Sequence, residues 1–273
     1  MPGVLLQALL ETLAGIGWTQ ALAISAALVL ASLLRAFTGF GFALAAVPAL
    51  SLFLLPSEAV VLSAALTVVA NGSSLHSYRG DYPVRQLLPL LAMSVVGTAL
   101  GVLVLSGLST LQFQLLIGPC VLLVCVVLTL YRPLPQQQPR PWRRRWGAVV
   151  GFLSGLMNGA FAIPGPPVVV FAMATERDPA RSRAMLLYFF LFSALIALVI
   201  FGFAGYLSWR TLQLMVLALP AMIVGDQIGL RLFRRYGKGT YRRAALFVLY
   251  AMGISLTARG LFGIVAGGWV ATA

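Results

Sequence analysis

Charged residues are scarce in this chain of 273 residues: they make up 9% of it, whereas a typical soluble domain contains about a quarter. Hydrophobic residues make up 60%, and the mean hydropathy is +0.97. Such a chain cannot cover itself with a polar surface. Apolar runs long enough to cross about 30 Å of hydrocarbon recur from end to end. The composition therefore predicts an all-α polytopic membrane protein, with residues 1–273 forming a single transmembrane domain.

Acidic residues, histidine and cysteine are rarer still, with six Asp and Glu, one His and two Cys. A metal centre needs a cluster of such side chains, so we expect no metal and no cofactor. Ser74 and His76 would have to supply a catalytic pair, but they lie two residues apart and do not share a helix face. Cys120 and Cys125 are expected to be buried thiols. We therefore expect no catalytic residues and no enzyme.

Ten apolar segments bounded by charges, Pro or Gly are expected, of which roughly 8–10 lie in the membrane. The last two before residue 176 share only thirty residues, too few for two crossings of about 20 residues each, and are consistent with two half-helices. The segments are 18–36, 38–55, 58–76, 86–106, 111–131, 146–160, 163–175, 184–205, 210–230 and 243–263.

The net charge of +13 has its simplest source in cytoplasmic loops, which are enriched in Lys and Arg, and does not call for a nucleic acid. When the basic linker 132–145 is placed in the cytoplasm, only Arg210 and Arg259 of the 19 basic residues fall outside. This orientation predicts that both termini are periplasmic.

The two halves of the chain, 18–131 and 146–263, share landmarks in the same order. "GDYPVRQL" (80–87) aligns with "GYLSWRTL" (205–212), and "GTALG" (97–101) aligns with "GDQIG" (225–229). An odd number of segments in each half turns the second copy upside down. Two inverted repeats with interrupted or re-entrant helices, as in secondary transporters, are therefore predicted, although apolar helices with scattered Gly also align by chance.

Helix breakers gather at corresponding places, in "RAFTGFGFALAAVP" (35–48) and "NGAFAIPGPP" (158–167). Non-helical backbone at membrane depth is tolerated only where it is buried in protein or faces water. Free N–H groups at the start of a half-helix can bind an anion, whereas the alternative is a simple kink. Arg35 is either an anion ligand or a marker of the cytoplasmic boundary. The substrate-binding candidates at the breaks are Arg35, Thr38, Gly39, Phe40, Gly41, Asn158, Gly159, Pro164, Gly165 and Pro166.

Other polar residues inside the apolar segments are further candidates. Asn71 and Ser74 share a helix face and either bind substrate or join helices. His76 and Asp226 are candidates for coupling transport to an ion. The alternatives are a passive histidine near the membrane surface and an ion pair of Asp226 with Arg231.

The glycine-rich "GFGF…VP", the Pro/Gly-rich "NGAFAIPGPP" and the turns "GDYPVRQL" and "GYLSWRTL" resemble the TauE/SafE family of sulfite exporters. The resemblance covers roughly residues 20 to 260. It implies a permease of the bacterial inner membrane for small anions, often sulfur-containing ones such as sulfite or sulfonates. Phe40 and Phe42 between and after the first glycines give a bulkier lining, which favours an organic anion over bare sulfite.

These observations together predict a secondary transporter that moves a small anion by alternating access. An anion channel is the alternative, and an intramembrane enzyme is a weaker one. The expected partners are the small-molecule anion and the lipid bilayer, and a homodimer stays open as a further partner.

Overall fold

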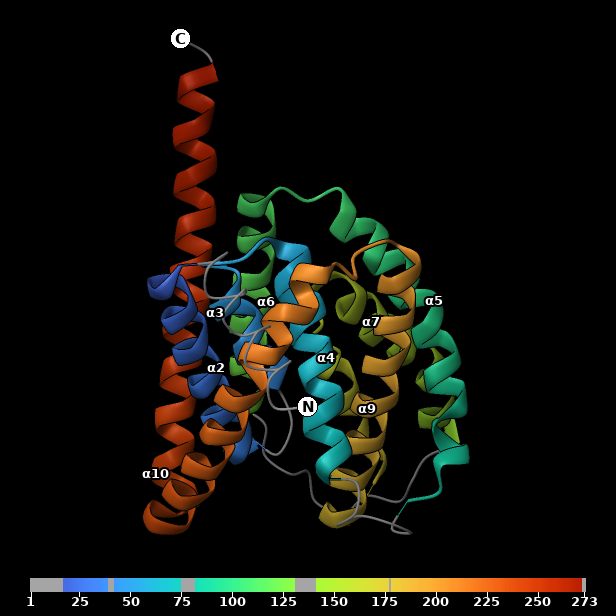
Figure 1. Ribbon diagram of the computed structural model, residues 1–273. Coiled ribbons are helices and arrows are strands. Elements are labelled where there is room, and N and C mark those ends of the chain that lie inside the picture. Colours follow the sequence, from blue (N-terminus) through green and yellow to red (C-terminus); the bar gives the residue numbers. More distant parts are fainter. Residues whose placement is uncertain (1–16, 39–41, 75–81, 131–140, 177, 272–273) are drawn as a thin grey trace.

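The computed structural model describes residues 17–38, 42–74, 82–130, 141–176 and 178–271, which form helices and their connections without any strand (Figure 1). The all-α prediction is confirmed. The helices are α2 (Trp18–Thr38), α3 (Phe42–Leu50), α4 (Pro56–Ser74), the short 3-10 helix η2 (Val84–Leu87), α5 (Leu88–Ser106), α6 (Thr110–Leu130), α7 (Pro141–Phe161), α8 (Gly165–Thr175), α9 (Pro179–Phe203) and α10 (Trp209–Ala271).

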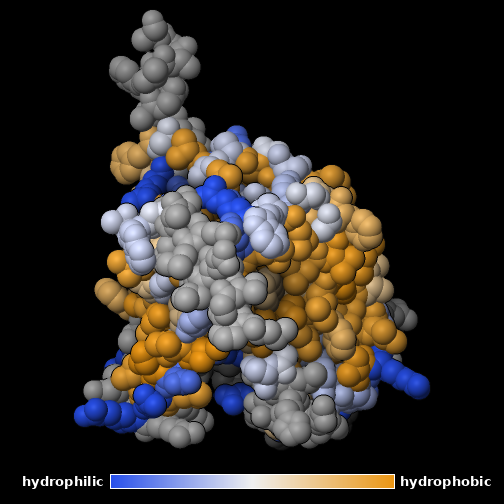
Figure 2. Space-filling view, viewed as in Figure 1, coloured by the Kyte–Doolittle hydropathy of each residue, from blue (hydrophilic) through white to orange (hydrophobic). Residues whose placement is uncertain are grey.

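Within the part of the chain that the structure describes, six helical stretches are long and apolar enough to cross a membrane, and two shorter apolar helices accompany them. Figure 2 shows hydrophobic residues over the flank of the bundle and hydrophilic residues near its ends, as expected for a protein surrounded by lipid. The prediction of a polytopic membrane protein is thus confirmed. The six stretches are Trp18–Arg35, Val84–Ser106, Thr110–Val127, Ala180–Phe203, Trp209–Leu232 and Leu246–Gly263.

Helix α10 contains the last two of these stretches, and Figure 1 shows how they fit in one bundle. Its first part, in orange, descends beside α2, and its later part, in red, runs back past α6 and beyond the bundle. The predicted segments 210–230 and 243–263 therefore both lie within α10.

The pair of segments 146–160 and 163–175 differs from the expectation of two half-helices. Helix α7 has 21 residues and α8 has 11, so only α8 is a half-helix. Helix α7 is longer because it begins at Pro141 and takes in the linker arginines, which are good helix formers. Likewise, α3 has only 9 residues within the predicted segment 38–55.

Glycine seams hold the bundle together. Helices α5 and α7 make the most extensive contact, in which Gly97 and Gly101 face α7 while Gly151, Gly155 and Gly159 face α5. A Cβ atom on Gly155 would lie 2.3 Å from the carbonyl oxygen of Ser94. Helices surrounded by lipid are not driven together by the hydrophobic effect. Close van der Waals packing of backbones at small residues stabilises their association instead.

Helix α10 packs on α2 through a comparable seam, in which Gly225 meets Val29 and Ser32.

The helix starts also repeat. Helices α7, α8 and α9 begin 123 positions after α2, α3 and α4, respectively (141 minus 18 for the first pair). The starts are residues 18, 42 and 56 in the first set and 141, 165 and 179 in the second. The order of the helices thus recurs at a constant spacing; the two inverted repeats stay a prediction.

Candidate functional site

The two breaks meet at one cavity. Its empty volume is about 570 Å³ including its open mouth, and its walls come from the starts of α3 and α8, from α4, α6 and α9, and from the connection between α7 and α8. Most of the wall is apolar. The lining residues are Phe42, Ala43, Leu44, Thr67, Asn71, Val124, Val127, Ala162, Ile163, Pro164, Gly165, Pro166, Val169 and Phe190.

The second break is formed by a left-handed residue followed by prolines. Ala162 has a φ of 52°, which ends the helical path of α7, and the Ile163 N–H donates to the carbonyl oxygen of Met157 at 3.3 Å. Pro164 then precedes α8 as its N-cap. A left-handed non-glycine residue is uncommon and marks a backbone constrained by its surroundings.

These prolines also limit the donors that the expected anion site can offer. Pro164, Pro166 and Pro167 carry no backbone N–H, so Gly165 supplies the one N–H between Ile163 and Val168. A Cβ atom on Gly165 would meet nothing within 4 Å, so this position borders open space at the cavity. The start of α8 therefore offers an anion fewer backbone N–H donors than the sequence analysis led us to expect.

The polar side chains of the cavity wall come from α4. Thr67 and Asn71 are four residues apart and share a helix face. The Thr67 hydroxyl donates to the carbonyl oxygen of Ser63 at 2.7 Å, and Asn71 is buried. Thr67 was not among the sequence candidates, although its spacing from Asn71 was the signal that could have identified it.

Arg35 of α2 bonds to the backbone of α4 and pairs with an acid 191 residues further along the chain. Its Nη1 atom donates to Oδ2 of Asp226 at 2.7 Å, and its Nη2 atom donates to the carbonyl oxygen of Ala70. The expected pairing of Asp226 with Arg231 is therefore wrong. Asp226 sits on the face of α10 that packs on α2, which brings it to Arg35.

Asn158 and Gly159 hold helices together at this depth. The Asn158 side-chain amide donates to the carbonyl oxygen of Ser193 at 2.9 Å, which ties α7 to α9. Gly159 packs against the backbone of α5, where a Cβ atom would lie 2.1 Å from the Thr98 carbonyl oxygen. Neither residue lines the cavity.

The remaining candidates fall outside the described part of the chain in whole or in part. Gly39, Phe40, Gly41 and His76 lie in segments that the structure does not describe. Thr38 and Ser74 end α2 and α4, and only their backbone is described.

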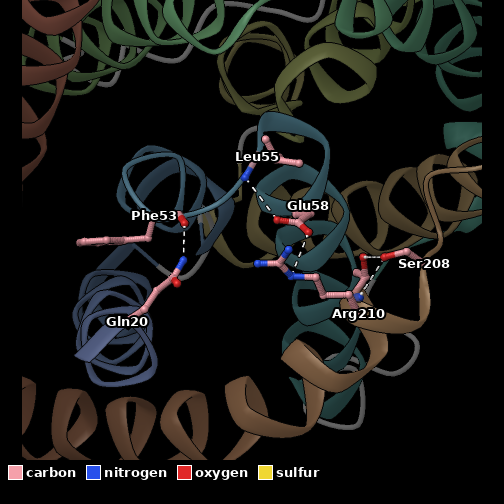
Figure 3. A network of polar contacts seen from close by, with 7 residues as sticks. Gln20, Phe53, Leu55, Glu58, Ser208 and Arg210 are labelled. Carbon is pink, nitrogen blue, oxygen red and sulfur yellow. Dashed lines mark hydrogen bonds and ion pairs between the residues drawn. The ribbon is translucent and has the colours of Figure 1, made fainter. Parts of the chain in front are cut away.

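Polar contacts join the two halves at one end of α4 (Figure 3). Glu58, in the first turn of α4, accepts from the Leu55 N–H at 3.3 Å and pairs with Arg210 of α10 at 3.4 Å. Nearby, the Gln20 amide donates to the carbonyl oxygen of Phe53 at 2.7 Å, which ties α2 to the connection before α4. Arg210 is one of the two basic residues that were predicted to lie outside.

A second polar cluster follows the other end of α4. Arg181 pairs with Glu176 at 3.4 Å, and its guanidinium carbon lies 6.0 Å from the ring centroid of Tyr82. Burial and the nearby Glu176 charge raise the pKa of Tyr82 to about 12, so this phenol stays neutral at physiological pH. Contacts thus join the first half to the second at two places, through Glu58 in the first turn of α4 and through Tyr82, which follows α4 in the sequence.

Comparisons with known proteins agree with this membrane architecture. The family model of the sulfite exporter TauE/SafE matches residues 24–256. The chain is similar to the probable sulfite/organosulfonate exporter TauE of Cupriavidus necator, with 25% identity over 228 residues, or 80% of this chain and 86% of the relative. It is also similar to the probable inner membrane transporter protein TsaS of Comamonas testosteroni, with 32% identity over 106 residues, or 38% of this chain and 44% of that protein.

No solved structure gives a significant match. Both relatives are named as transporters or exporters, which agrees with a bundle of membrane-spanning helices around a cavity. Because the family model covers most of the chain, this protein belongs to the sulfite exporter TauE/SafE family of membrane transporters.

Proposed function

We propose that this transporter moves a small organic anion through the cavity between the two breaks, by alternating access in the inner membrane. The observation that carries the proposal is the convergence of the start of α3 and the connection between α7 and α8 on one cavity. Interrupted helices from two halves of a transporter typically form its substrate site near the middle of the bilayer. The regular spacing of the helix starts supports two equivalent halves.

The lining favours an anion that carries an apolar body. Asn71 and Gly165 are suited to donate to the oxygens of an anionic head, because a side-chain amide and a backbone N–H can both bind oxygen. Phe42, Val124 and Phe190 line the apolar remainder of the cavity, where a hydrated ion would lose its water without replacement. An organosulfonate fits this lining better than sulfite does, and the relative from Cupriavidus necator is named for both.

Flux in proteoliposomes tests the proposal, with sulfite, methanesulfonate and benzenesulfonate as probe anions. We expect saturable uptake with the lowest KM for benzenesulfonate. Gly165→Leu places a side chain in open space at the cavity, so the protein folds but transport falls at least tenfold. Gly147→Ala is the matched control, because its Cβ atom meets side chains at an ordinary 3.6 Å.

Two results would contradict the proposal. Uptake that rises linearly with anion concentration would indicate a channel. Full transport by Gly165→Leu, with unchanged KM, would place the anion path elsewhere.

A further inference from the structure

A charged pair lies inside the bundle next to the proposed anion site. Arg35 and Asp226 expose 11% and 24% of their side chains and join α2, α10 and α4. The α4 carbonyl group that accepts from Arg35 belongs to Ala70, and the next residue, Asn71, lines the cavity. The Arg35 guanidinium group therefore bonds to the backbone of α4 one residue before Asn71, which forms part of the polar wall of the cavity.

The corresponding place in the second half carries no charge. Arg35 donates to the carbonyl oxygen of the residue 35 positions later, and Asn158 does the same with Ser193, also 35 positions later. Asn158 lies 123 positions after Arg35, and the same distance in sequence separates the starts of their helices, α7 and α2 (141 minus 18). One contact is thus made twice, once by a charged side chain and once by a neutral amide.

The partner helices repeat the same contrast. Asp226 follows Gly225 in "GDQIG", and Thr98 follows Gly97 in "GTALG". Both glycines pack on the facing helix, α2 for Gly225 and α7 for Gly97. Thr98, whose hydroxyl oxygen is buried without a partner among the described residues, and Asn158 occupy these places without charge, so the fold does not require an ion pair at the equivalent site. Charges inside a membrane are costly and are usually kept for function.

The ion pair is also incomplete. Only Oδ2 of Asp226 receives a hydrogen bond from Arg35, whereas Oδ1 is buried and has no partner among the described residues. A carboxylate with one unpaired buried oxygen is held less firmly than one that is fully bonded. Such an anion can be exchanged for another.

We infer that Asp226 is a built-in substitute for the transported anion: its carboxylate occupies Arg35 while the cavity is empty, and the anion displaces it during transport. Guanidinium groups bind carboxylates and sulfonates through the same charge-assisted hydrogen bonds. Displacement frees α10 from its charged tie to α2 and α4, so the anion itself loosens the joint between the halves. This inference rests on the proposed function.

The direction in which a substitution of Asp226 changes the affinity for the anion tests this inference. An internal competitor lowers the apparent affinity for the ligand, because Arg35 is available only for a fraction of the time. Asp226→Asn should therefore bind benzenesulfonate about tenfold more tightly than wild type, while its turnover falls because the anion is no longer displaced. Binding is measured by calorimetry on purified protein, and KM and kcat are measured by flux in proteoliposomes.

The double variant Arg35→Asn/Asp226→Thr is the matched control, because it copies the neutral arrangement of the second half. We expect it to melt near the wild-type temperature and to bind benzenesulfonate more weakly than wild type. If Asp226→Asn is unstable without ligand, benzenesulfonate should raise its melting temperature more than it raises that of wild type.

Three results would overturn the inference while leaving the proposed function in place: Asp226→Asn binding no tighter than wild type, its melting temperature rising no further with ligand, or the double variant binding as tightly as wild type. If wild type itself neither binds nor transports any of the three probe anions, the proposed function fails as well.

Discussion

Asn71 and Asn158 are both buried amides in apolar helices, yet they have different surroundings. Asn71 lines the cavity, whereas Asn158 bonds to Ser193 of α9. Their sequence contexts resemble each other, since each precedes a glycine. The packing of the neighbouring helices therefore determines that Asn71 lines the cavity and that Asn158 joins two helices.

These two residues give a paired prediction at the residue scale. Asn158→Ala should lower the stability of the protein by about 1 kcal/mol, because it removes one buried hydrogen bond, and should leave anion affinity unchanged. Asn71→Ala should lower anion affinity and leave the melting temperature nearly unchanged. Thermal melts with and without benzenesulfonate measure both quantities, and the opposite pattern would exchange the two roles.

The sequence predicted the place of the breaks but not every contact around them. Pro164 and Gly165 mark the second break because proline and glycine disfavour helix interiors, a local effect that can be read directly. The partner of Asp226 could not be read in this way, since Arg35 lies 191 residues away and the nearer Arg231 competed for the assignment. Tertiary packing of α10 on α2 decided between them.

At the scale of helices, the seam between α5 and α7 depends on the absence of side chains. Gly151, Gly155 and Gly159 lie four residues apart, so they share one face of α7. Their spacing is visible in the sequence, but the helix that they face is not. The length of α7 was also not predicted, because its polar first turn gave no apolar signal.

Enlarging a glycine in this seam should separate the helices. In Gly155→Val, the new Cβ atom would lie 2.3 Å from the Ser94 carbonyl oxygen, and backbone atoms cannot move aside as a side chain can. We expect a loss of stability of more than about 3 kcal/mol, seen as a broadened or absent folded peak in size-exclusion chromatography. Gly147→Ala, on the same helix, should elute as wild type does; equal behaviour of the two variants would exclude a close seam.

At the scale of the whole molecule, the basic residues predict how the bundle lies in the membrane. The linker 132–145 and the basic stretch between the two spans of α10 should face the cytoplasm. The connection between α9 and α10, which contains the exposed Leu207, should face the periplasm.

Cysteine labelling tests this orientation. Single cysteines at Gln138 or Lys238 should resist an impermeant thiol reagent added to intact cells, whereas one at Leu207 should react. The native Cys120 and Cys125 are first replaced by Ala; both are free thiols. Labelling of Gln138→Cys from outside, with Leu207→Cys protected, would reverse the orientation.

The pairing of α2 with α10 also constrains how the protein is made. Ribosomes deliver helices to the membrane in chain order, so α2 is inserted long before the helix that completes its contacts is synthesised. During that interval the Arg35 side chain must remain in a growing chain that does not yet contain Asp226, which follows 191 residues later. Final assembly of α2 therefore waits for α10, and the contact between these two helices forms only after the helices between them have been synthesised.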